Sequence, residues 1–192
     1  MHKSPVLARF TLALAAAALF AAPAGATTLM RAGLDELVRG NETVVQGKVV
    51  DIHSYWNADH TFILTDVRVR PNTFFKGLGR SSEDVTYTLP GGTVGETSVI
   101  LIGMPELVPG SEYLLFLNRE DLPGATDRLT IRDLVQGAFD VANVRGQKRV
   151  FSQAIGTPLV ADRGGLTDVV GGRDGLDLGD MTRQIHRILG ER

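Results

Sequence analysis

Two histidines and two aspartates near one predicted turn are the residue types best suited to bind a metal ion. Asp51 and His53 precede this turn, and Asp59 and His60 lie in it. Imidazole and carboxylate groups are suitable metal ligands. Their spacing matches no metal motif, however, and turn residues are commonly polar because they face water. We therefore predict no metal site here.

The acidic stretch GGRDGLDLGD, residues 171–180, is similar to the calcium-binding nonapeptide pattern G-G-x-G-x-D-x-U-x. It occurs once, and Asp174 stands where the pattern has glycine. Such repeats must stack on one another to bury their faces. The stretch also lacks the residue order of an EF-hand loop. We interpret it as a loop that leads into a helix.

Motifs of the common enzyme classes are absent from the sequence. There is no G-x-S-x-G, no H-E-x-x-H and no G-x-x-x-x-G-K-[ST]. The chain has no cysteine, which excludes thiol catalysis and thiolate-bound metal centres. A carboxylate acid/base pair, such as Asp66 with Glu96, remains an alternative. No feature of the sequence distinguishes one such pair of carboxylates from another. We predict no catalytic residues and no cofactor, with an unrecognised carboxylate site as an alternative.

A binding surface is the more promising interpretation of the aromatic and glycine-rich segments. Aromatic residues flank the predicted turn near His60, and a second turn contains two successive glycines. Such groups at the rim of a rigid scaffold are suited to recognition. The alternative for Trp56 is that it caps the core. The candidate binding residues are Tyr55, Trp56, His60, Phe62, Gly91, Gly92 and Thr93.

The amino terminus has the layout of a secretory signal peptide. Lys3 and Arg9 precede an apolar run, and Ala24-Gly25-Ala26 provides a small-residue cleavage site. The run from Phe10 to Ala22 is shorter than the about 20 residues that span a bilayer. We therefore expect export, to the periplasm or the extracellular space. Residues 1–26 are excluded from the fold prediction.

The remaining chain has no feature of a nucleic-acid-binding or transmembrane protein. Without Lys3 and Arg9 it carries 18 basic and 22 acidic residues, a net charge of −4. Nucleic-acid binding favours a basic patch instead. No later segment is long and apolar enough to cross a bilayer.

Short apolar segments with turn residues between them dominate residues 43–151. The segment FILTDVRVR alternates as a half-buried strand does, and with VVQGKVVDIHSYW it predicts a hairpin. Gly47 lies inside the first strand, where glycine often marks a bulge or bend. Further strands are predicted in the segments DVTYTL, SVILIG, EYLLFL, LTIRDL, GAFDVAN and KRVF.

Two helices flank the strands. A short helix is predicted over residues 28–38, from apolar residues at helical spacing. At the carboxyl end DMTRQIHRIL predicts an amphipathic helix with Asp180 as its N-cap and His186 on the solvated face. Its apolar stripe contains Met181, Ile185, Ile188 and Leu189.

The expected fold is mainly β, a small closed antiparallel barrel of OB type with a short N-terminal and a C-terminal amphipathic helix. We divide the chain into a signal peptide (1–26), an N-terminal helix (27–40), the barrel (41–155) and a loop with the C-terminal helix packed on the same domain (156–192).

Several segments together resemble a known pattern. VVQGKVVDI, TDVRVRPNTFFKG, VTYTLPGG and GSEYLLFL resemble, in this order, the strands of the netrin-like module shared with tissue inhibitors of metalloproteinases. The stretch from Pro90 to Leu117 is closer still to uncharacterised bacterial exported proteins. The resemblance covers about Val44 to Val141 and implies an OB-like barrel. It implies no inhibitory residue, because the inhibitors bind the protease zinc through an N-terminal cysteine, which this chain lacks.

The function predicted from the sequence is that of a noncatalytic exported binding module. Its rim loops would recognise a protein, a peptide or a glycan. The alternatives are a regulator or inhibitor of an exported protease and an enzyme with a carboxylate site.

Overall fold

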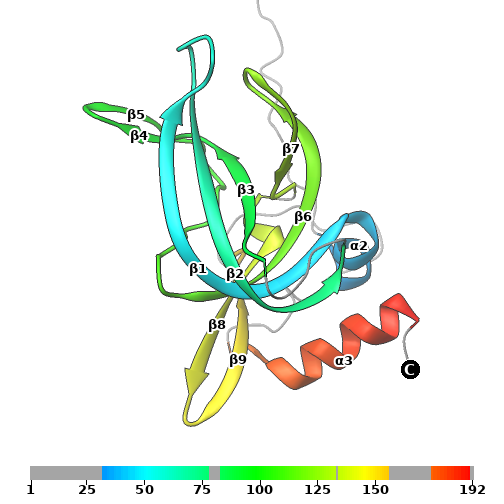
Figure 1. Cartoon of the computed structure of the whole chain (residues 1–192). Helices are drawn as coiled ribbons and strands as arrows, with labels where there is room; N and C mark the ends of the chain where they lie inside the picture. The colour runs from blue at the N-terminus through cyan, green and yellow to red at the C-terminus, as the bar shows by residue number, and fades with distance from the viewer. Residues whose placement is uncertain (1–31, 78–82, 133, 156–173, 191–192) are drawn as a thin grey trace, which may run out of the picture.

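The computed structural model describes residues 32–77, 83–132, 134–155 and 174–190. The predicted signal peptide and residues 156–173 lie outside these ranges. The described chain is mainly β, as predicted (Figure 1). Its elements are α2 (Leu34–Gly40), β1 (Thr43–Trp56), β2 (Ile63–Lys76), β3 (Val85–Pro90), β4 (Gly92–Val94), β5 (Thr97–Val99), β6 (Glu112–Leu122), β7 (Ala125–Thr130), a 3-10 turn η1 (Leu134–Gly137), β8 (Ala138–Val144), β9 (Gln147–Ser152), β10 (Leu176–Asp177) and α3 (Leu178–Leu189).

One antiparallel sheet contains most strands, in the order β10-β9-β8-β6-β1-β2-β3. The predicted hairpin is confirmed, with Trp56 of β1 opposite Ile63 of β2. The strand β6 pairs with β1 and, along its length, with two further strands. Its residues 112–115 pair with β8, and its residues 118–122 pair with β7. The sheet therefore forks at β6, and the branch β3-β2-β1-β6-β7 curls round on itself (Figure 1).

The two ends of this curl, β3 and β7, lie close to each other. No hydrogen-bonded pairing joins β3 to β7 within the described chain, so the sheet is not closed into a barrel there. No helix in the four described ranges is long and apolar enough to cross a membrane.

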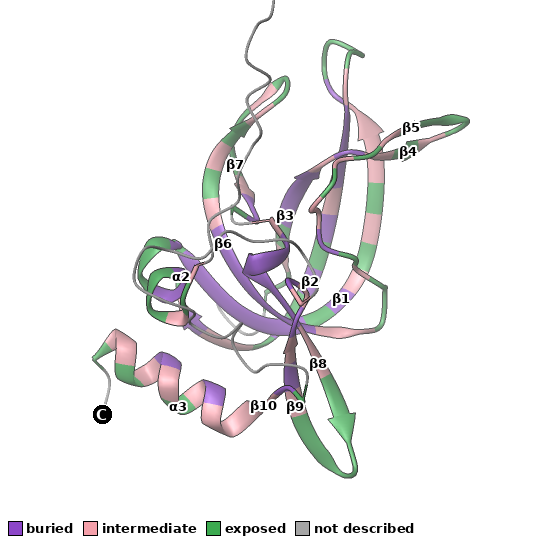
Figure 2. Cartoon of the chain, turned by 180° about the vertical axis from the view of Figure 1, so that it is seen from behind, coloured by how far each residue is buried: buried purple, intermediate pink, exposed green. Residues whose placement is uncertain are grey.

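Successive residues of a strand point to opposite faces, and here both faces of the sheet are buried. Val45 of β1 belongs to an inner core enclosed by the curl, whereas its neighbour Val44 belongs to an outer core under the helices. Figure 2 shows long buried stretches along β2 and β6. The inner core also contains Val67, Tyr87, Leu89, Tyr113 and Leu115. The outer core contains Leu37, Phe75, Phe116, Phe139, Met181 and Ile185.

The glycine inside β1 lies at a bend, as predicted. The β1–β2 register shifts between Gln46 and Gly47, which faces Pro71. A Cβ atom on Gly47 would lie 2.5 Å from the carbonyl oxygen of Arg70 and 2.9 Å from the Cα atom of Pro71. Only glycine lets the two backbones come this close.

Four local predictions were wrong. The segment LTIRDL was predicted as a strand, but β7 ends at Thr130 and the 3-10 turn η1 begins at Leu134. The segment SVILIG was predicted as a strand, but β5 ends at Val99, because its partner β4 begins at Gly92, opposite Val99. The C-terminal helix is capped by Asp177, not Asp180; the Asp177 carboxylate accepts from two backbone N–H groups. His186 is not on a solvated face, because its ring meets Phe75 edge-on at a centroid distance of 5.6 Å.

Candidate functional site

The predicted turn Gly91–Thr93 is held to β2, just after the predicted hairpin end around Tyr55–Phe62, by one backbone and one side-chain hydrogen bond. The Gly91 N–H donates to the carbonyl of Ile63 at 2.8 Å. The Thr65 hydroxyl donates to the carbonyl of Gly91 at 2.6 Å. The turn that follows β3 is therefore fixed against the hairpin.

A buried side chain orders the tip of the β1–β2 hairpin. The amide oxygen of Asn57 accepts from the backbone N–H groups of Thr61 and Phe62, at 2.9 and 3.1 Å. Its amide nitrogen donates to the carbonyl of Pro123 in the β6–β7 turn at 3.2 Å. Two loops that are far apart in the sequence are tied together by this one residue.

The aromatic side chains at the hairpin end do not form one surface. Tyr55 and Trp56 are successive strand residues and point to opposite faces. The Trp56 ring stacks on His60, with centroids 6.5 Å apart. The Tyr55 hydroxyl donates to the Asp66 carboxylate at 3.0 Å, and burial together with this carboxylate raises the pKa of Tyr55. Tyr55 is therefore a protonated donor at neutral pH.

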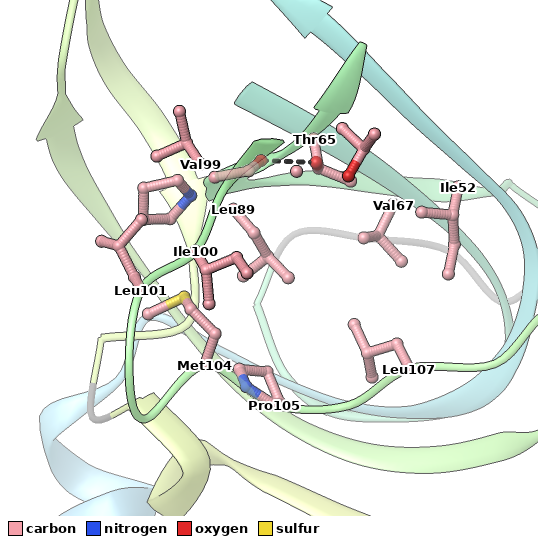
Figure 3. A pocket seen from close by; sticks show the side chains of 14 residues that line it. Ile52, Thr65, Val67, Leu89, Val99, Ile100, Leu101, Met104, Pro105 and Leu107 are labelled. Atoms are coloured by element: carbon pink, nitrogen blue, oxygen red, sulfur yellow. Dashed lines mark hydrogen bonds between the residues drawn. The ribbon is translucent and has the colours of Figure 1, made fainter. Parts of the chain in front are cut away.

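An apolar pocket of about 260 Å³ lies beside the turn, between β2, β3 and the segment 99–107 (Figure 3). It includes Gly91, Gly92 and Thr93 of the predicted site, but none of the four predicted residues of the hairpin end. Its walls continue the inner core through Val67 and Leu89. The other apolar side chains lining it are Ile52, Pro90, Val99, Ile100, Leu101, Met104, Pro105 and Leu107.

The pocket has almost no polar side chains. None of its fourteen lining residues is charged, and the side-chain hydroxyls are those of Thr65 and Thr93. The single Thr65 hydroxyl proton goes to Gly91, so Ser54 must be the donor in the 2.8 Å contact between the hydroxyls of Ser54 and Thr65. The Thr93 hydroxyl is paired with that of Ser98 at 2.9 Å. The pocket is thus suited to apolar groups and not to proton transfer.

Two isoleucines are exposed to an unusual degree: Ile100, which lines the pocket, and Ile102, two residues further along the chain. Ile100 is 86% exposed and Ile102 is 97% exposed, although large aliphatic side chains are usually buried. The exposure of both residues could not be predicted from the run VILI, which has the composition of a core strand. The turn residues Gly91-Gly92 could have indicated this exposure. A strand that begins after Pro90 is too short to pair with the whole segment SVILIG, so the end of that segment has no strand partner.

A second, polar groove of about 630 Å³ lies between β6, β8 and β9. Glu112 is its most connected residue. Its carboxylate accepts from Lys148 at 2.7 Å, Gln46 at 2.7 Å and Asn72 at 2.8 Å. Burial raises the pKa of Glu112, but these hydrogen bonds and the Lys148 charge outweigh burial and lower it overall. This network stabilises the meeting point of four strands, β1, β2, β6 and β9.

The remaining candidate groups are dispersed. Asp66 accepts from Tyr55 and Thr88, whereas Glu96 lies exposed at the turn between β4 and β5. In the described ranges no three histidine, aspartate or glutamate side chains come together as metal ligands would. Asp174 to Asp180 of the acidic stretch form a turn, β10 and the start of α3.

No protein-family model matches this sequence, and no curated protein matches it.

Proposed function

We propose that this protein is a noncatalytic exported binding module that holds an apolar side chain of a partner protein in the pocket beside β3. The observation that carries this proposal is the uncharged lining of the pocket, whose two threonine hydroxyls are already hydrogen-bonded within the protein. An apolar group placed there loses no hydrogen bond and gains burial of its surface.

The size of the pocket favours an anchoring side chain over a larger ligand. Sites for drug-sized molecules have volumes of about 300 to 1,000 Å³, and a cavity of about 150 Å³ holds benzene. The volume here, about 260 Å³, lies between these. Ile100, which is 86% exposed, adds an accessible apolar side chain to the lining of the pocket, where a partner protein could bury it.

A protein or peptide partner is favoured over a glycan. Glycans present hydroxyl groups that need hydrogen-bond partners when they are buried, and this pocket offers few. The predicted rim residues Gly91, Gly92 and Thr93 take part through their backbone. The predicted residues of the hairpin end, from Tyr55 to Phe62, lie outside this pocket and are not part of the proposed contact.

The proposal includes export and an OB-like barrel. The amino-terminal basic and apolar pattern supports export. The curl that brings β3 close to β7 supports an OB-like arrangement. A second candidate function is regulation of an exported protease, which is favoured by the β4–β5 arm that stands away from the sheet (Figure 1).

The pocket can be tested with a small apolar probe and one blocking substitution. Val99 is half-buried and lines the pocket, so Val99→Trp should fill it. Val144, which is 38% exposed on the β8–β9 hairpin, supplies the matched control Val144→Trp. The probe is N-acetyl-leucinamide, followed through methyl NMR shifts of the protein.

The expected result is that the probe shifts methyl signals of Val67, Leu89 and Leu107 in the wild type and in Val144→Trp. The same signals should not respond in Val99→Trp, provided that this variant unfolds at a similar denaturant concentration. Equal responses in both tryptophan variants, or none in the wild type, would contradict binding in this pocket.

A further inference from the structure

The polar groove of about 630 Å³ between β6, β8 and β9 has an acidic lining. Three of its thirteen lining residues are acidic, and none is lysine, arginine or histidine. The Glu112 carboxylate is paired with Lys148. The other two acidic residues, Glu106 and Asp140, have no ion pair within the part of the chain that the structure describes. The groove therefore favours a positively charged group.

One amide side chain joins these two acidic residues. The Gln153 Nε2 atom donates to the Asp140 carboxylate and to the backbone carbonyl of Glu106, both at 2.8 Å. The Gln153 Oε1 atom accepts from the backbone N–H of Glu106 at 2.9 Å. The segment before β6 and the strand β8 are thus held together, and a ligand meets Glu106 and Asp140 in a fixed arrangement.

A buried hydroxyl lies on the same wall as Asp140. Tyr113 of β6 is directly opposite Asp140 of β8, so the two side chains leave the same face of the sheet. Tyr113 is 3% exposed and lines the groove. Its oxygen accepts from the N–H of Val108, another lining residue, at 2.9 Å.

The hydroxyl proton of Tyr113 has no acceptor within the described chain. Buried polar groups are almost always hydrogen-bonded, and an unmet donor is costly. A ligand that brings an oxygen atom to Tyr113 would satisfy this donor. The groove therefore asks for an acceptor beside the positive charge.

Apolar side chains complete the lining of the groove. Val108 is 51% exposed, although large aliphatic side chains are usually buried. Met104, Val135 and Ile155 line the groove as well. A ligand with an apolar part gains burial of its surface here.

We infer that this groove binds the amino-terminal residue of a peptide. Its ammonium group pairs with Asp140 and Glu106, its carbonyl oxygen accepts from Tyr113, and its apolar side chain packs against Val108. A free amino acid is disfavoured because the acidic lining repels its carboxylate, and a lysine side chain brings no acceptor for the hydroxyl. This site is separate from the apolar pocket beside β3 and does not rest on the function proposed for that pocket.

Three small ligands separate the contributions. Leucinamide carries the ammonium group and the carbonyl, N-acetyl-leucinamide lacks the charge, and 3-methylbutylamine lacks the carbonyl. Each is titrated to about 20 mM at about pH 6, where an α-amino group is protonated, and followed through the methyl NMR signals of Val108 and Val135. Leucinamide should bind about tenfold or more tightly than N-acetyl-leucinamide and about fivefold or more tightly than 3-methylbutylamine.

Substitutions in the protein test the two charges. Asp140→Asn keeps an oxygen for the Gln153 amide, and Glu106→Gln alters an exposed residue. Each should weaken leucinamide binding by about fivefold or more. The control Asp59→Asn removes one charge from an exposed position in the turn between β1 and β2 and should change binding by less than about twofold.

The hydroxyl is tested by Tyr113→Phe with two ligands. This variant should bind leucinamide about fivefold more weakly than wild type and bind 3-methylbutylamine with unchanged affinity, since only leucinamide brings an acceptor. A merely structural effect of the substitution would weaken both ligands alike. That result, or an unchanged affinity for leucinamide, would overturn the assignment of a peptide amino terminus.

Two further outcomes would overturn the site as a whole. One is equal binding of leucinamide and N-acetyl-leucinamide at the groove signals. The other is no shift of Val108 and Val135 at up to about 20 mM ligand. Shifts confined to Val67 and Leu89 would place the ligand in the apolar pocket, so the groove would be refuted while the function proposed for that pocket stands.

Discussion

The hydroxyl of Thr65 donates to the carbonyl of Gly91 at 2.6 Å and ties the beginning of the hairpin strand β2 to the turn that follows β3. Gly92 follows with a φ of +131°, and a Cβ atom there would overlap the hydroxyl groups of Thr65 and Ser54. The wall of the apolar pocket therefore depends on one buried hydroxyl and one glycine.

Replacement of this hydroxyl should destabilise the protein. Thr65→Val keeps the shape of the side chain but leaves the Gly91 carbonyl and the Ser54 hydroxyl without this partner, at a cost of about 1–3 kcal/mol. Urea unfolding gives the free energy. Thr86→Val, an exposed threonine on β3, serves as the control and should change it by less than about 0.5 kcal/mol. Equal effects of the two would show that the buried contact stabilises nothing.

Loss of the buried amide at the hairpin tip should loosen the predicted binding surface. Asn57→Ala removes acceptors for Thr61 and Phe62 and the bond to Pro123, so we expect a loss of about 2–3 kcal/mol. Hydrogen exchange should become faster at Thr61 and Phe62. The control is Asp59→Ala, at an exposed position in the same turn, and unchanged exchange in Asn57→Ala would contradict the assignment.

Glu112 should make stability depend on acid pH. Its folded pKa is lower than the ordinary value of 4.5, so its contribution is fully present above about pH 4.5 and is lost as the pH falls through the folded pKa. Glu112→Gln should be about 1–3 kcal/mol less stable than wild type near neutral pH, and this difference should shrink as the pH falls below 4.5 and through the folded pKa.

The comparison for Glu112 is Glu42→Gln, which alters an exposed ion pair with Arg119. Exposed pairs contribute about 0–1 kcal/mol, so this variant should stay close to wild type. If the stability difference between wild type and Glu112→Gln did not change with pH, the carboxylate network would not have the role described.

The N-cap of α3 can be identified by two substitutions. Asp177→Ala removes the acceptor for the N–H groups of Gly179 and Asp180 and should cost about 1 kcal/mol. Asp180→Ala, at the position that the sequence favoured, removes only an exposed pair with Arg183 and should cost less. The reverse order, measured by thermal or urea unfolding, would support the cap predicted from the sequence.

Local patterns were sufficient for much of the fold. The alternation in FILTDVRVR predicted a strand, and the β1–β2 hairpin is present with its bend at Gly47. The apolar stripe of the C-terminal helix was also predicted correctly, since Met181 and Ile185 are buried. These features depend on neighbours in sequence, which a periodic pattern reports directly.

The pocket depends on contacts that such patterns do not report. Val67 and Met104 line it together although they are far apart in the chain. The run VILI predicted a strand because apolar residues indicate a tendency to be buried, not the presence of a partner strand. Ile100 is exposed because β4 begins at Gly92, opposite Val99, and has no residue that pairs with Ile100. This pairing is a property of the tertiary structure and not of the local sequence.

Neighbouring side chains of β1 face opposite interiors. Val44 faces the interior under the helices, and Val45 faces the interior enclosed by the curl. A bulkier residue on either side would push the shared ribbon toward the other interior. We therefore expect substitutions in the two interiors to be energetically coupled and to require joint compensation during evolution. Because one strand contributes to both interiors, neither can open alone, and the molecule should melt in a single step.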